Sequence, residues 1–369
     1  MKATKYYDAE TLYFSKLYGS GIYKWSGQLV PDPLCVDNGE GLTSPLLINV
    51  ISGEQYYARR FSYGARGQFH FWKTVLTPAQ KKCILWPSDI IEIGGRQENL
   101  FKLFVSQEYA PVATPIEKRE GDFALLFPYG GYPNVENGIR KIAKIDELNW
   151  KNSDVRRMAV GIARAIENVN RDGYFYTDIH LSRLFFSDDW ETYLDFSNLM
   201  FSVCDSLGEN AEEICGVSDG DYPIEFGDPS VVRGIIPHLD YHSQNYSLCA
   251  LLFYLFFGVY PYDGRLLTGY ADDAPQSHYI KFRDYHKMPV FIFDPDDVSN
   301  RLGAMAEERE IIYLWEELPD VLQDLFLRTL KQSNAERTDE VNNPTPSMWL
   351  KCFAELGWCD DTEDGGQDA

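Results

Sequence analysis

Apolar and polar residues alternate through much of the first third of the chain, and this period predicts β-strands. Between Pro31 and Phe61 the turn signals NGEG and SGE divide the pattern into three strands. Further strand candidates occupy residues 81–93, 98–109 and 122–129, and Phe69–Leu76 is a candidate short helix among them. We therefore expect the first third to be rich in β-structure.

Beyond Tyr129 the apolar residues recur at helical spacing. A stripe that ends at Val169 predicts a helix that Ser153 caps and that runs to about Asn170. Further helices are predicted at Ser243–Phe257, Trp315–Lys331 and Ser347–Leu356. The aromatic side chains of the first of these are expected in the core: Phe253, Tyr254, Phe256 and Phe257. A β-rich third followed by helical two-thirds is an α+β plan with two lobes.

Composition narrows the choice of partners and compartment. The 369 residues include 34 Lys+Arg and 56 Asp+Glu, and this net charge of −22 repels nucleic-acid phosphates and anionic lipids. A cationic partner or a metal-bound anion would bind more readily to a chain with this negative charge. The seven cysteines have no paired spacing, so we expect reduced thiols in a cytoplasmic protein. The longest apolar run, Leu248–Phe257, is too short for a membrane span, which needs roughly 20 residues.

The first candidate for chemistry is Gly39-x-Gly41 in a strand–turn–strand setting. Glycines there let backbone N–H groups approach phosphates, although an ordinary hairpin turn also explains them. Arg60 lies on the following strand, where a cation could hold a triphosphate beneath the hairpin. A solvated pair of arginines, Arg59 and Arg60, is the alternative.

The second candidate is a pair of aspartates, each next to apolar residues. Asp178 follows the long predicted helix, and Asp195 begins the loop after a predicted strand. One such carboxylate can orient a hydroxyl nucleophile, and the other can hold Mg²⁺ between phosphates. Turn aspartates that accept backbone N–H bonds would explain either residue alone.

The order of these features resembles a protein kinase catalytic domain. In detail the chain resembles bacterial kinase-like proteins that are often encoded beside von Willebrand-type A domains and metal-dependent phosphatases. The resemblance covers Gly39 to Trp358 and is carried by CILWPSDII (83–91), YTDIHLSRLFF (176–186), YLDFS (193–197), SLCALLFYLFFGVYPYDG (247–264), PVFIFDPDDVSNRL (289–302), LPDVLQDLFLRTL (318–330) and NPTPSMW (343–349). It implies an extension (1–30), a small β-rich lobe (31–128), a larger helical lobe (129–358) and a disordered acidic tail (359–369).

The resemblance also implies roles for single residues. Asp178 matches the catalytic-loop aspartate, Asp195 the metal-binding aspartate of Asp-Phe-Gly, and His180 the lysine that touches the transferred phosphate. Both aspartates would face a cleft roofed by the glycine hairpin, with ATP and one Mg²⁺ as the implied cofactors. Nucleotide contacts are implied for Gly39, Gly41, Ser44, Ala58, Arg183 and Arg60, or Arg59 if the alignment shifts by one.

Several positions depart from the kinase pattern. Arg183 replaces the asparagine that binds a second Mg²⁺, and a guanidinium has only donors. Ser197 replaces the glycine after Asp-Phe, Tyr176-Thr177 replace His-Arg, and Gln244 replaces the buried-helix aspartate. No glutamate that would pair with the strand cation is identified.

These departures favour a pseudokinase or very weak kinase that acts as a nucleotide-sensing or docking component of a bacterial signalling system. One alternative is an active, atypical Ser/Thr kinase with Asp178 as base and Asp195 on Mg²⁺, in which Arg183 replaces the second ion. The other is an α+β binding protein without nucleotide function. A protein partner or protein substrate is expected in the first two cases.

Overall fold

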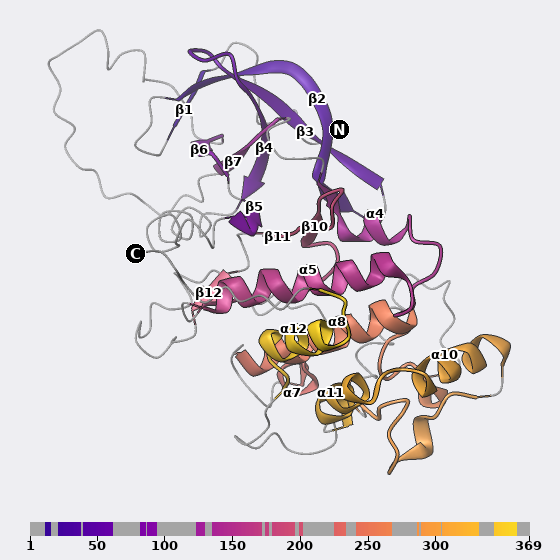
Figure 1. Ribbon diagram of the computed structural model, residues 1–369. Coiled ribbons are helices and arrows are strands. Elements are labelled where there is room, and N and C mark those ends of the chain that lie inside the picture. The colour runs from indigo at the N-terminus through magenta and orange to yellow at the C-terminus, as the bar shows by residue number, and fades with distance from the viewer. Residues whose placement is uncertain are drawn as a thin grey trace, which may run out of the picture. The chain divides into compact units, whose positions relative to one another are not determined.

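The computed structural model (Figure 1) describes residues 12–15, 21–37, 40–61, 82–85, 87–93, 123–129, 135–171, 174–176, 179–195, 199–201, 225–233, 241–267, 286–287, 289–303, 305–331 and 343–359. The protein is α+β, with mainly antiparallel strands. It divides into two compact units. Unit 1 comprises residues 1–77, 86–134 and 212–216, and unit 2 comprises residues 78–85, 135–211 and 217–369.

The described residues of unit 1 form a six-stranded antiparallel sheet. In spatial order its strands are β1 (Leu12–Phe14), β2 (Ile22–Asp37), β3 (Glu40–Asn49), β4 (Gln55–Phe61), β7 (Phe123–Pro128) and β6 (Asp89–Glu92). An isolated bridge joins Ser15, just after β1, to Ile91 of β6, so the two edges of the sheet meet. The three strands predicted between Pro31 and Phe61 are confirmed, but β2 already begins at Ile22, within the predicted extension.

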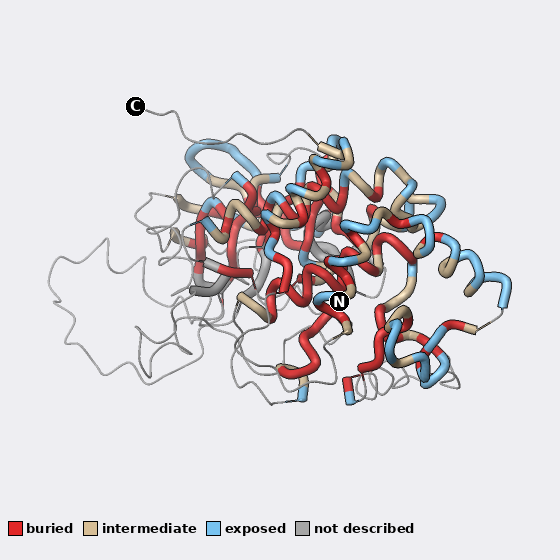
Figure 2. The backbone as a smooth tube through the Cα atoms, turned by 60° about the horizontal axis from the view of Figure 1, so that its bottom comes forward, coloured by how far each residue is buried: buried red, intermediate tan, exposed pale blue. Residues whose placement is uncertain are grey.

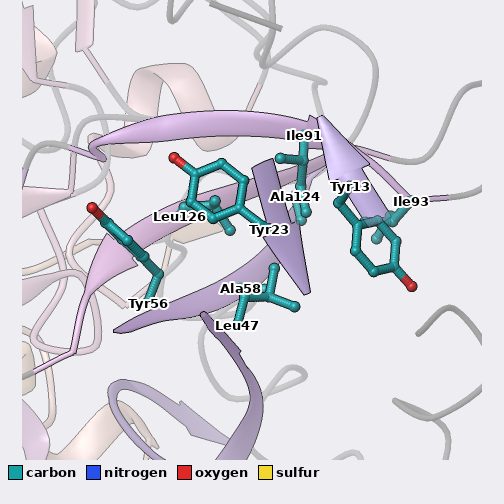
Figure 3. Packing of buried hydrophobic residues seen from close by; sticks show 9 residues of the cluster. All are labelled: Tyr13, Tyr23, Leu47, Tyr56, Ala58, Ile91, Ile93, Ala124 and Leu126. Atoms are coloured by element: carbon teal, nitrogen blue, oxygen red, sulfur yellow. The ribbon is translucent and has the colours of Figure 1, made fainter. Parts of the chain in front are cut away.

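The interior of this closed sheet holds an apolar cluster to which every strand, or the residue beside it, contributes (Figure 3). Its members are Tyr13, Tyr23, Leu47, Tyr56, Ala58, Ile91, Ile93, Ala124 and Leu126. The rings of Tyr23 and Tyr56 pack edge to face with centroids 5.5 Å apart. Asp89 of β6 accepts hydrogen bonds from the hydroxyls of Tyr23 and Ser15, each at 2.7 Å. Residues near the N-terminus thus complete the core of unit 1.

The described part of unit 2 contains two small sheets among helices. One has the order β5 (Ile84–Leu85), β11 (Thr192–Asp195), β10 (Leu184–Phe186) and β8 (Glu136–Asn137), in which only β5 and β11 pair in parallel. The other pairs β12 (Leu199–Phe201) with β9 (Tyr174–Tyr176) antiparallel.

The helices of unit 2 are built around α5 (Ser153–Asn170) and α8 (Tyr241–Phe257). The apolar stripe of α5 is buried, and α8 is buried on nearly every side (Figure 2). α12 (Pro346–Glu355) packs on α5, and α11 (Asp320–Leu330) packs on α8. The remaining described helical segments are α4 (Gly138–Ile142), α7 (Pro229–Val232), α10 (Ala306–Glu316) and the 3₁₀ turns η5 (Arg265–Leu267) and η6 (Val298–Asn300).

Two helix predictions need correction. α5 has the predicted bounds, but its cap is Asn152, whose side chain accepts from the Asp154 amide at 2.9 Å. The single helix predicted over 315–331 is wrong. Pro319 separates α10 from α11, because proline lacks an N–H and disfavours helical backbone in the residue before it. The elements predicted at 69–76 and 98–109 lie outside the described residues.

Candidate functional site

The strand that precedes Asp178 pairs with the strand that follows Asp195. β9 ends at Tyr176, and β12 begins at Leu199. These two residues are direct partners in the antiparallel pair. The chain therefore leaves β9 toward Asp178 at the same end of the pair at which it enters β12 from Asp195. Asp178 itself and the side chain of Asp195 lie outside the described part of the structure.

The buried helix α8 holds the end of β9. The side-chain oxygen Oε1 of Gln244 accepts a hydrogen bond from the backbone N–H of Tyr176 at 2.7 Å. Both residues are buried, with Gln244 2% and Tyr176 0% exposed. An unpaired buried amide costs free energy, so this bond fixes the backbone two residues before Asp178.

The segment between β9 and β10, here called the His180 loop (residues 179–183), is held by polar contacts. Nδ1 of His180 accepts from the Ser182 amide at 3.1 Å and lies 2.7 Å from the Ser182 hydroxyl. Because Nδ1 accepts from an amide, the proton of the neutral ring is on Nε2. Asn137 donates to the Ser182 carbonyl at 2.5 Å while its Oδ1 caps α4. These contacts hold the His180 ring in one orientation.

Arg183 is the last residue of the His180 loop, and Asp195 is the last residue of β11. The Arg183 side chain is exposed, and its backbone N–H donates to the His180 carbonyl at 2.9 Å. Asp195 pairs with Leu85 of β5. Among the described residues no group of three or more His, Cys, Asp or Glu side chains could hold a metal ion.

A cluster of four aromatic rings that no local sequence pattern predicts lies beside the His180 loop. The Phe226 ring centroid is 5.7 Å from that of His180, 5.8 Å from Tyr254 and 5.5 Å from Tyr260. Phe226 is buried, whereas the other three are half-buried. The expectation that Phe253, Phe256 and Phe257 are core residues is confirmed, but Tyr254 reaches the surface. These four residues are the aromatic cluster.

The glycine hairpin of unit 1 has the predicted strand–turn–strand form. β2 and β3 are paired up to Asp37 and Glu40, with Val36 opposite Gly41. Gly39 lies outside the described residues. Asn-Gly at positions 38–39 is a sequence typical of a two-residue hairpin turn, which fits an ordinary turn as well as a phosphate loop.

The structure places Ser44 and Ala58 on opposite faces of the sheet. Ala58 is in the interior cluster together with Leu47. On β3 successive side chains alternate in direction, so Ser44, three residues before Leu47, lies on the other face. This second face includes Leu46, whose partner on β4 is Tyr57. The side chains of Ser44 and Ala58 therefore lie on opposite faces of the sheet.

The same register distinguishes the two strand arginines. The backbone of Arg60 pairs with Ala124, a member of the interior cluster, whereas that of Arg59 pairs with Leu125. Strand position 59 consequently belongs to the face of Ser44 and Tyr57, and position 60 to the face of Ala58. The side chains of both arginines lie outside the described part of the structure.

Comparison with known proteins identifies no family for this chain. Its sequence matches no protein-family model and no curated protein. No described helix is long and apolar enough to cross a membrane.

Proposed function

We propose that the chain is a protein kinase-like protein, a pseudokinase or very weak kinase, that binds a nucleotide and acts as a docking component of a bacterial signalling system. The observation that carries the proposal is the β9–β12 pair. It brings the segments that carry Asp178 and Asp195 to one end of a small sheet. The bond between Gln244 and Tyr176 supports it, because a buried helix then positions the segment before Asp178.

The donors near this end of the sheet suit a phosphate group. His180 and Arg183 carry donors of the kind that bind phosphate, a ring N–H and a guanidinium. Mg²⁺ held by Asp195 would neutralise further charge on the phosphates. Arg183 cannot ligate a second ion, and this limits stabilisation of a transferring phosphoryl group. Tight nucleotide binding with little or no turnover is the expected combination.

The sheet register favours Arg59 over Arg60 as the strand cation of this proposal. Position 59 shares a face with Ser44, which follows the glycine hairpin, whereas position 60 shares the face of the closed core. We expect Arg59→Gln to weaken nucleotide binding about tenfold or more, since it removes a charge-assisted phosphate contact. Arg60→Gln is the matched control, and equal losses in both variants would contradict the assignment.

A phosphotransfer assay separates this function from an active kinase. Purified protein is incubated with labelled ATP and Mg²⁺ or Mn²⁺, beside Asp178→Asn. We expect no label transfer above background, together with a rise in melting temperature on adding ATP, because a ligand that binds the folded state stabilises it. Transfer that Asp178→Asn abolishes would establish the active kinase. No thermal shift would favour the binding protein without nucleotide function.

A further inference from the structure

We propose that the aromatic cluster of His180, Phe226, Tyr254 and Tyr260 binds the cationic side chain of a lysine or arginine in the protein that docks on this chain. The inference rests on the proposed function in one respect, that a protein partner engages the His180 loop. It adds the chemistry of recognition, a positive side chain held over aromatic faces.

The cluster has a buried base and partly exposed sides. Phe226, 2% exposed, is the base, and it contacts rings from three segments: the His180 loop, α8 through Tyr254, and the residues after α8 through Tyr260. The rings of Tyr254 and Tyr260 are tilted by 31° with centroids 4.9 Å apart. A cation within about 6 Å of such rings is attracted to their negative faces.

Two carboxylate residues are close in sequence to members of the cluster, Glu225 beside Phe226 and Asp263 three residues after Tyr260, and one cation, Arg183, lies on the His180 loop. Burial raises the pKa of the Tyr260 hydroxyl, and Tyr254, Glu225 and Asp263 raise it further, which places both carboxylates in electrostatic reach of that hydroxyl. Both carboxylate residues are half-buried, so solvent screens them less than fully exposed acids. The net charge of −22 also draws a positively charged partner toward the whole protein.

The position of the cluster links recognition to the proposed nucleotide site. The His180 ring belongs to the cluster, and the same ring is fixed by Ser182 in the loop that follows β9. A partner whose cation lies on these rings brings its neighbouring residues next to the His180 loop. For a pseudokinase this gives a docking contact, and for an active kinase it would select substrates with a nearby basic residue.

The test compares arginine with citrulline, its neutral near-isostere. The probes are serine peptides in which a single arginine is moved along an alanine background, each paired with its citrulline counterpart. Binding to the full chain is measured by fluorescence anisotropy in the presence of MgATP. We expect at least one arginine position to bind about tenfold more tightly than its citrulline counterpart. Equal affinities at every position would overturn the proposal.

Variants test whether a preference for arginine over citrulline arises from the aromatic cluster. Tyr254→Leu should abolish the preference and Tyr254→Phe should retain it, because phenylalanine keeps the ring. Tyr313→Leu, at an exposed tyrosine on α10, is the matched control and should change nothing. Should Tyr254→Leu fail to fold, Glu225→Gln and Asp263→Asn preserve side-chain shape and should reduce the preference. A preference that survives all of these changes would overturn the proposal, whereas loss of ATP binding alone would count only against the nucleotide function.

Discussion

At the scale of single residues, Gln244 connects the buried helix to the segment before Asp178. Gln244→Ala leaves the Tyr176 amide without its partner inside the core. We expect the free energy of unfolding to fall by about 1–3 kcal/mol in a denaturant titration. Gln55→Ala, at an exposed position, is the control and should have a much smaller effect. Equal losses in the two variants would show that the buried bond contributes nothing specific.

The Cys83 thiol gives a prediction about pH. Burial raises its pKa from 9.0 to about 12. The unfolded chain therefore loses this proton at lower pH than the folded chain, so unfolding becomes easier as pH rises from about 9 toward 12. The stability difference between the native chain and Cys83→Ala should be constant below pH 9 and should change in favour of the variant above it. A difference that does not vary with pH would contradict this.

At the scale of elements, β1 is short but completes the closed sheet of unit 1. It contributes Tyr13, 2% exposed, to the interior cluster, and Ser15 beside it bonds to Asp89. Deleting residues 1–20 should cost about 3 kcal/mol or more, the scale of losing a large buried side chain, and should expose apolar surface that binds a hydrophobic dye. Deleting residues 360–369 is the control. Unchanged stability after the first deletion would show that β1 is dispensable.

Local patterns predicted part of this architecture. The stripe of α5, the apolar length of α8 and the turn signals around β3 are all properties of neighbouring residues, and these elements are confirmed. The break at Pro319 was also a local signal, but the apolar pattern on both sides of it concealed the end of α10.

What the sequence could not provide depends on contacts between distant residues. The face of Ser44 relative to Ala58 follows from cross-strand register, which no single strand reveals. The aromatic cluster joins the His180 loop to Phe226 and α8, and only the fold brings these segments together. The role of β1 also depends on its contact with β6. The sequence predicts Tyr254 to be a core residue because its neighbours on α8 are core residues.

At the scale of the whole molecule, the net charge of −22 affects stability as well as partner choice. Mutual repulsion of the excess carboxylates opposes the compact state, and salt screens this repulsion. Raising NaCl from about 0.01 M to about 0.5 M should therefore raise the melting temperature. Scanning calorimetry measures the shift. A melting temperature that falls steadily over this range would indicate that attractive ion pairs outweigh the repulsion.

The proposed function requires that a nucleotide binds together with Mg²⁺ held by Asp195. Its most direct test is isothermal titration calorimetry of the full chain with MgATP, with metal-free ATP, and with MgATP against Asp195→Asn. We predict saturable binding of one nucleotide per chain, weakened about tenfold or more when either Mg²⁺ or the Asp195 carboxylate is absent. No heat of binding to the folded protein, or binding that neither change weakens, would contradict the account.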